Sequence, residues 1–124
     1  MRLLLDTHAF LWWRSDPRRL APKAERAIAK AEIVFVSAAS AWEAVIKAAL
    51  GKLRFPGSFE AAVEDSDFSK LEVTFAHVEA LRDLPPHHAD PFDRMLVAQA
   101  RLEGLTVVTR DPQFPPYGVP ILEA

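Results

Sequence analysis

Acidic residues in this sequence stand at places where chemistry is usual in α/β proteins. Asp6 directly follows the apolar run Arg2–Leu5, and Asp111 comes just after the β-branched run Thr106–Thr109. If both runs are parallel strands, the two carboxylates lie beyond the carboxyl ends of those strands, where ligands gather in open parallel sheets. A helix cap accounts for Asp6 equally well, and a turn accounts for Asp111.

A second pair of acids occurs in the segment HHADPFDRMLVAQA, residues 87–100. Asp90 is expected to cap a helix whose first residue is Pro91, because aspartate caps well and proline is favoured at the first helical position. Asp93 falls in the first turn, where the helix dipole favours a negative charge. Capping therefore explains both acids, and this segment alone does not require a ligand.

Glu43 lies about one turn into the helix expected after the apolar run Ile33–Val36. Lys47 follows it at the i, i+4 spacing, which is typical of an ion pair on a solvated helix surface. The large apolar side chains of this helix fall on another face: Trp42, Val45, Ile46 and Ala49. Taken alone, Glu43 is therefore expected to be a solvated glutamate.

The elements that must position these acids alternate along the chain. Strands are expected at Arg2–Leu5, Ile33–Val36 and Thr106–Thr109, and weaker strands at Leu71–Val73 and Pro120–Leu122. Helical patterns cover Thr7–Trp13, Pro22–Lys30, Ala38–Leu50, Phe59–Glu64, Phe75–Leu81 and Pro91–Glu103. This alternation predicts an α/β fold with a mainly parallel sheet covered by helices on both faces.

Length and composition are consistent with one domain spanning residues 1–124. The chain has 124 residues, half of them hydrophobic, and no cysteine. A disulfide framework and a zinc site of thiolates are excluded, and the lack of cysteine agrees with a reducing compartment. No run approaches the roughly 18 apolar residues that a membrane span needs. We expect a soluble, cytoplasmic protein that does not contact a membrane.

The charge balance permits a polyanionic partner without indicating one. The formal net charge is -2, from 15 basic and 17 acidic residues, whereas nucleic-acid binders are often strongly basic. If four acids surround a metal ion, subtracting them from the 17 leaves 13 acids against the 15 bases. The surface outside such a site would be slightly positive.

Four segments together resemble the successive motifs of PIN-domain ribonucleases, in particular the VapC toxins of toxin-antitoxin pairs: LLLDTHAFLWW, SAASAWEAVIK, HHADPFDRMLVAQA and LTVVTRD. The resemblance implies a three-layer fold around about five mainly parallel strands. It implies that RNA is hydrolysed at a Mg²⁺ or Mn²⁺ site formed by Asp6, Glu43, Asp93 and Asp111. In the family pattern the acid just before the RMLVAQA-type run is the ligand. Asp93 is therefore interpreted as a ligand and Asp90 as the cap.

The resemblance also implies partners: an RNA substrate, a cognate antitoxin and a second copy of the chain in a homodimer. The first helix contains the apolar residues Phe10–Trp13, which are expected to serve core packing and a partner surface. The sequence does not determine which of them has which role. One alternative is a non-catalytic PIN-like module that binds RNA or protein. A phosphohydrolase with a nucleophilic aspartate is disfavoured, because LLLDTH lacks the second acid two residues later.

Other polar side chains lie close to these acids, and the sequence favours structural roles for them. Thr7 and Thr109 are expected to be a helix-cap and a strand threonine, with a hydroxyl that orients a site carboxylate or a water as the alternative. Arg94 and Arg110 are expected in local salt bridges near the carboxylates, with contact to a phosphate as the alternative. The basic stretch after the first helix is expected on a solvated face, with contact to RNA as the alternative: Arg14, Arg18 and Arg19. His87 and His88, a loop pair with no assigned acid, are expected at the surface.

Overall fold

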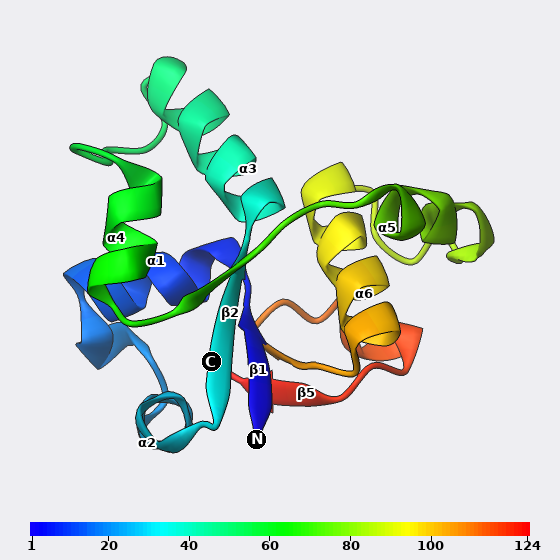
Figure 1. Ribbon diagram of the computed structural model, residues 1–124, viewed down its shortest axis with the longest axis horizontal. Helices are drawn as coiled ribbons and strands as arrows, with labels where there is room; N and C mark the ends of the chain where they lie inside the picture. The colour runs from blue at the N-terminus through cyan, green and yellow to red at the C-terminus, as the bar shows by residue number, and fades with distance from the viewer.

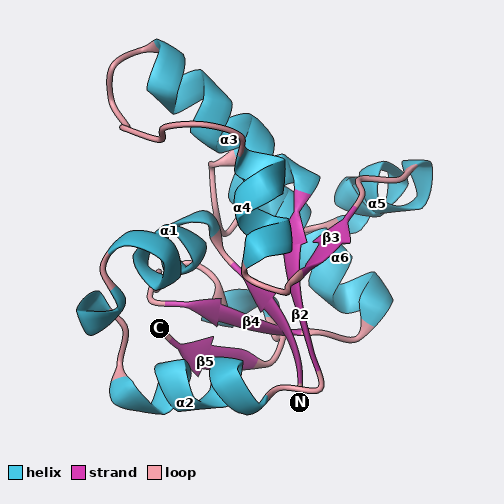
Figure 2. Ribbon diagram, turned by 60° about the vertical axis from the view of Figure 1, so that its left-hand side comes forward, coloured by secondary structure: helices cyan, strands magenta, loops and turns pink.

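The computed structural model describes residues 1–124 and contains one five-stranded sheet in the order β3-β2-β1-β4-β5. Every neighbouring pair of strands is parallel. The strands are β1 (Arg2–Leu5), β2 (Ile33–Ser37), β3 (Ser69–Leu71), β4 (Thr106–Thr109) and β5 (Ile121–Glu123). The strands fan out across the sheet as a result of its twist (Figure 2). The expected parallel sheet of about five strands is confirmed.

Six α-helices connect and cover the strands: α1 (Thr7–Ser15), α2 (Pro22–Lys30), α3 (Ala38–Ala49), α4 (Phe59–Asp65), α5 (Phe75–Ala80) and α6 (Pro91–Glu103). Short 3-10 turns occur at Pro17–Arg19, Leu81–Asp83 and Pro115–Tyr117. The six expected helices are confirmed, and their ends differ from the expected ones by at most two residues. No helix is both long enough and apolar enough to cross a membrane.

The weak strand expected at Leu71–Val73 was misplaced by two residues. The structure places β3 at Ser69–Leu71, where it pairs with Phe35–Ser37 of β2. Val73 cannot extend this strand, because the next residue, Thr74, caps α5 through its side chain. The cap directs the chain away from the edge of the sheet.

Alternate side chains of β1 enter two different cores, as the two-residue period of a strand requires. Leu3 and Leu5 pack with residues of α1, α2, α3 and α4, whereas Leu4 packs with α6 and the segments around it. Figure 1 shows α1, α2 and α4 on one side of the central strands and α5 and α6 on the other. The predicted three-layer arrangement is confirmed.

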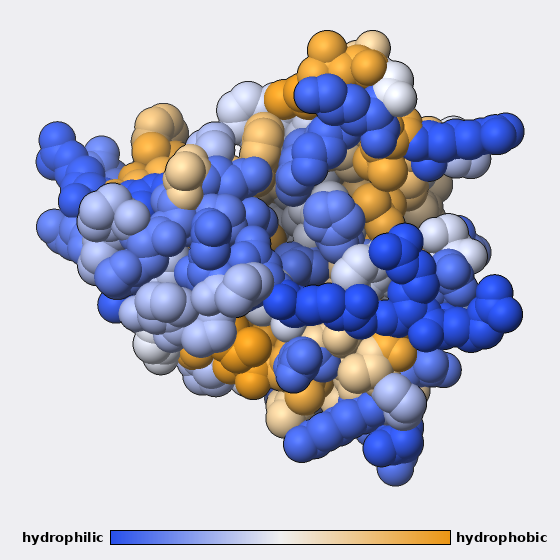
Figure 3. Space-filling view, turned by 180° about the vertical axis from the view of Figure 1, so that it is seen from behind, coloured by the Kyte–Doolittle hydropathy of each residue, from blue (hydrophilic) through white to orange (hydrophobic).

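The orientation of α3 differs from the one that its sequence favoured. The small residues Ala39 and Ala44 are buried, and the Glu43 residue beside them is only 3% exposed. Trp42 and Val45 are 64% and 62% exposed. Alanines allow α3 to pack closely, so the larger apolar side chains remain outside, where apolar residues gather over α3 in Figure 3. The expectation of a solvated Glu43 was wrong.

Candidate active site

The four acids singled out in the sequence line one cavity of about 370 Å³ at the carboxyl ends of β1 and β4. Its walls contain a single hydrophobic residue and are formed by Asp6, His8, Trp12, Arg19, Glu43, Asp93, Arg110 and Asp111. A cavity of about 410 Å³ lies between α3 and α6 but has no titratable side chain in its lining. The polar cavity is therefore the candidate for chemistry.

Asp6 both caps a helix and faces this cavity. Its Oδ1 accepts a hydrogen bond of 2.8 Å from the main-chain N–H of Ala9 in α1. Burial raises the pKa of Asp6, and hydrogen bonds from the Thr109 side chain and Ala9 partly oppose that rise. Thr109 Oγ1 also accepts a bond of 3.1 Å from the N–H of Asp111. Thr109 thus links two site acids, a role that the sequence reading ranked below a simple strand position.

Glu43 is held by hydrogen bonds to both of its carboxylate oxygens. Thr7 Oγ1 donates to Oε1 at 2.6 Å, and Lys47 Nζ donates to Oε2 at 2.6 Å. The hydrogen bond to Glu43 is also the main reason that the pKa of Lys47 is raised. The expected Glu43–Lys47 pair is confirmed, but the Glu43 carboxylate lies in the site rather than on a solvated surface.

The two acids at the start of α6 have different surroundings. Asp90 Oδ1 accepts hydrogen bonds from the main-chain N–H groups of Phe92, at 2.8 Å, and Asp93, at 3.1 Å, which confirms it as the cap. Asp93 instead faces the cavity. Burial, followed by the negative charges of Asp90 and Glu43, raises its pKa to about 7, whereas nearby His88 acts in the opposite direction.

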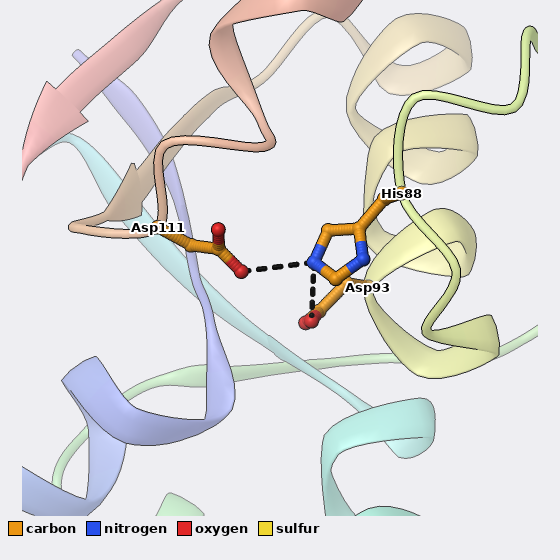
Figure 4. A group of neighbouring side chains, drawn as sticks. All are labelled: His88, Asp93 and Asp111. Atoms are coloured by element: carbon orange, nitrogen blue, oxygen red, sulfur yellow. Dashed lines mark hydrogen bonds and ion pairs between the residues drawn. The ribbon is translucent and has the colours of Figure 1, made fainter.

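His88 is a site residue that the sequence reading missed. Its side chain is only 9% exposed, and Nε2 lies 2.8 Å from Asp111 Oδ2 and 3.0 Å from Asp93 Oδ2. Figure 4 shows the imidazole reaching from the loop before α6 into the space between the two carboxylates. Its Nδ1 accepts a 3.1 Å hydrogen bond from the N–H of Asp90, so the neutral ring carries its proton on Nε2. The signal in the sequence that could have identified His88 was its position two residues before the helix cap Asp90.

The arginines next to the acids have different roles. Arg94 donates to the main-chain oxygens of Leu84 and Pro85 and to the Tyr117 hydroxyl, and so fastens the loop before α6. Arg110 lines the cavity. His87 is exposed, and its ring contacts Tyr117 at a centroid distance of 5.0 Å. The expected surface position is correct for His87 and wrong for His88.

The apolar residues Phe10–Trp13 of the first helix lie mostly against the core. Phe10 is fully buried, whereas Leu11, Trp12 and Trp13 are half-buried against the core. Trp12 also lines the acidic cavity. Several exposed apolar side chains gather instead on α3 and the residue that caps its C-terminus: Trp42, Val45, Ile46 and Leu50.

The donor atoms in the cavity are of the kind that a hard divalent ion prefers. Ligand atoms of His88, Asp93 and Asp111 lie within 4.8 Å of one another, and the carboxylates of Asp6 and Glu43 line the same cavity. Carboxylates crowded together repel one another, which contributes to the raised pKa of Asp93. A divalent cation bound by oxygen atoms relieves that repulsion, so these residues fit Mg²⁺ or Mn²⁺.

Comparison with known proteins identifies the family of the chain. The sequence matches the PIN domain family over residues 3–119. The chain belongs to the PIN-domain family. It is 30% identical to Ribonuclease VapC22 of Mycobacterium tuberculosis, with 88% of this chain and 86% of the relative covered.

Solved structures share the fold of this PIN domain. DNA-bound VapBC from Salmonella typhimurium matches with a TM-score of 0.74 at 20% identity, covering 98% of this chain and 97% of that one. A toxin-antitoxin complex from Klebsiella pneumoniae matches with a TM-score of 0.66 at 20% identity, covering 98% and 96%.

The metal-free PIN domain is expected to lose stability as the pH rises from about 4 to about 7. The pKa of Asp93 is raised from 3.8 to about 7 in the folded state, and that of Asp6 is also raised. The folded protein therefore binds more protons than the unfolded chain in this range, so the free energy of unfolding falls with rising pH. Urea unfolding in EDTA at several pH values measures it.

The Asp93→Asn variant is the control for this pH dependence. It lacks the buried negative charge and is expected to be more stable than the unchanged protein at pH 7 in EDTA, with a smaller difference near pH 4. A stability difference that does not change with pH would show that Asp93 ionises normally in the folded state.

Proposed function

We propose that this PIN domain is a ribonuclease that hydrolyses phosphodiester bonds in RNA and depends on a divalent metal ion. The ion, Mg²⁺ or Mn²⁺, is bound by four acids: Asp6, Glu43, Asp93 and Asp111. The observation that carries the proposal is the convergence of these four acids, from separate parts of the chain, on one polar cavity. The name of the M. tuberculosis relative, a ribonuclease, supports the choice of RNA as substrate.

The residues of the chain have distinct tasks in this reaction. A bound divalent ion supplies an activated water and stabilises negative charge on the scissile phosphate. Thr7 and Lys47 orient the two oxygens of Glu43. Thr109 links Asp6 with the main chain of Asp111, and His88 holds the carboxylates of Asp93 and Asp111 at a fixed separation. The carboxylates are thus positioned before substrate arrives.

We also propose that the activity is restrained by a cognate antitoxin and that the chain forms homodimers. A similar structure from K. pneumoniae is described as a toxin-antitoxin complex, which supports the first partner. The exposed apolar side chains of α3 support a protein-binding role for that helix, because exposed apolar patches commonly mark protein interfaces. Light scattering of the chain alone and with the antitoxin measures both assemblies.

Incubation with RNA tests the proposed activity. We expect mixed cellular RNA to be cleaved in Mn²⁺, to remain intact in EDTA, and to be cleaved again when excess Mn²⁺ is restored. Sequencing the new ends identifies the target. RNA binding without cleavage in Mn²⁺ would instead support the non-catalytic module.

Replacing His88 by phenylalanine is expected to weaken Mn²⁺ binding by about 10- to 100-fold, the range for losing a partner that orients metal ligands. Phenylalanine keeps an aromatic ring against Phe114, which the imidazole meets edge-on at 5.8 Å, but it removes both ring nitrogens. Isothermal titration calorimetry measures the affinity without requiring catalysis.

The matched control for this change is His87→Phe, since His87 is adjacent, exposed and outside the acid cluster. We expect its Mn²⁺ affinity to equal that of the unchanged protein. Tighter Mn²⁺ binding by His88→Phe would show that the imidazole competes with the metal for these carboxylates.

A further inference from the structure

The acidic cavity has a second wall that is basic and aromatic. Arg19, Arg110 and Trp12 line the same space as the four carboxylates, together with the exposed His8. Arg19 lies in the short turn after α1, and Arg110 directly follows β4. Residues far apart in the chain therefore place two guanidinium groups beside the candidate metal ligands.

Arg19 and Arg110 differ from the other arginines of this region in their ion pairing. Arg14 pairs with Asp65 at 2.9 Å, and Arg18 pairs with Asp16 at 3.4 Å. Neither of them lines the cavity. Arg19 and Arg110 form no ion pair with any acidic side chain of the protein.

Trp12 holds both guanidinium groups in place. Arg19 Cζ lies 4.9 Å and Arg110 Cζ lies 4.4 Å from the centroid of the indole ring, within the range of cation-π attraction. Arg110 Nε and Nη2 also donate to the main-chain oxygen of Ala124, at 3.1 and 2.8 Å, and Nη2 donates to the main-chain oxygen of Arg19. Arg110 is thus anchored beside the turn that carries Arg19.

The two guanidinium groups carry like charges over one ring, and neither is within ion-pair distance of an acidic side chain, so they repel each other. A bound anion relieves this repulsion, and guanidinium groups match the oxygen geometry of phosphate. Four carboxylates in the same cavity repel a polyanion, so the attraction for a nucleic acid must come from cations such as these. Contacts to backbone phosphates supply much of the affinity for nucleic acids.

We infer that Arg19 and Arg110, held against Trp12, form a subsite for an RNA backbone phosphate next to the phosphodiester bond that is cleaved. This inference rests on the proposed ribonuclease function and adds a substrate contact to it. Arg19 is the principal contact, because its guanidinium has no hydrogen-bond partner in the protein, whereas Arg110 is partly occupied by main-chain oxygens.

The test compares Arg19→Ala with Arg18→Ala in EDTA, where cleavage is absent. Both variants remove one positive charge from the same turn, but only Arg19 lines the cavity. We expect Arg19→Ala to weaken binding of a fluorescently labelled single-stranded RNA by about tenfold, as for the loss of one charge-assisted contact. Its plot of log affinity against log salt should become shallower by about 0.7, the change for one phosphate contact in a single strand.

Arg18→Ala is expected to change RNA affinity by less than about twofold, as a surface charge screened by salt should. Equal effects of the two variants would overturn the inference. It would also be overturned if Arg19→Ala weakened binding of polyglutamate but not of RNA, since the subsite would then select protein carboxylates.

Cleavage by the unchanged protein in Mn²⁺ is measured in parallel. If the protein cleaves RNA but Arg19→Ala and Arg18→Ala weaken RNA binding equally, only the subsite is rejected. If only Arg19→Ala weakens RNA binding and the protein never cleaves RNA, the phosphate contact stands, but the ribonuclease function and the position next to a cleaved bond are rejected.

Discussion

Asp93→Asn is expected to reduce metal-dependent RNA cleavage by on the order of 10²-fold or more while the protein remains folded. Asparagine has nearly the same volume as aspartate but lacks the negative charge that stabilises a bound divalent cation. A 10²-fold loss corresponds to about 2.7 kcal/mol of lost transition-state stabilisation. Initial cleavage rates in Mn²⁺ measure the loss, and circular dichroism checks the fold.

Asp90→Asn is the matched control, three residues earlier and at the same helix terminus. Asp90 accepts hydrogen bonds from the N–H groups of Phe92 and Asp93. Asparagine caps helices about as well as aspartate, so we expect activity within a few-fold of the unchanged protein. If Asp90→Asn were as damaging as Asp93→Asn, the separation of cap and ligand would be wrong.

The second large effect concerns the antitoxin. A cavity lined by Asp6, Glu43, Asp93 and Asp111 attracts cations, and an arginine of the partner is expected to pair with carboxylates that the metal also needs. Metal and antitoxin then compete. When Mn²⁺ is present at 100 times its dissociation constant, the apparent affinity for the antitoxin is expected to fall by about 100-fold.

Antitoxin titrations at several Mn²⁺ concentrations measure this competition. Ionic strength is held constant, because screening alone weakens charge pairing. Glu43→Gln removes one of the shared charges and is expected to weaken both antitoxin binding and cleavage. An antitoxin affinity that does not vary with Mn²⁺ would mean that inhibition acts outside the acidic cavity.

Much of the fold follows from local patterns in the sequence. Apolar runs of strand length separated by helical patterns predicted the parallel sheet, and the Asp90-Pro91 start of α6 was predicted because caps depend on nearby residues. The strand β3 was placed two residues late. Its position depends on pairing with β2 and on the Thr74 cap, and a three-residue edge strand has little pattern of its own.

The orientation of α3 was harder to predict for a different reason. Hydrophobicity favours Trp42 and Val45 for the core, but the close approach of α3 admits Ala39 and Ala44 instead. That geometry buries Glu43. Periodicity shows which residues share a face, and it does not show which face the sheet can accommodate.

The site was only partly visible in the sequence. Asp6 and Asp111 were placed by their positions after strands, whereas Glu43 and Asp93 were chosen through the family resemblance. His88 was missed because its partner Asp111 is 23 residues away and meets it only after folding. For Arg19 and Arg110 a contact to RNA was ranked below a solvated face or a local salt bridge for the same reason, since their proximity to Trp12 is a tertiary contact.

Anomalous diffraction from a crystal soaked in Mn²⁺ shows whether the converging carboxylates form a divalent-metal site. We expect an anomalous peak in the cavity between the carboxylates of Asp93 and Asp111, and no such peak in crystals of Asp93→Asn soaked in the same way. A cavity without such a peak at a Mn²⁺ concentration that supports RNA cleavage, or a peak elsewhere in the protein, would contradict this expectation.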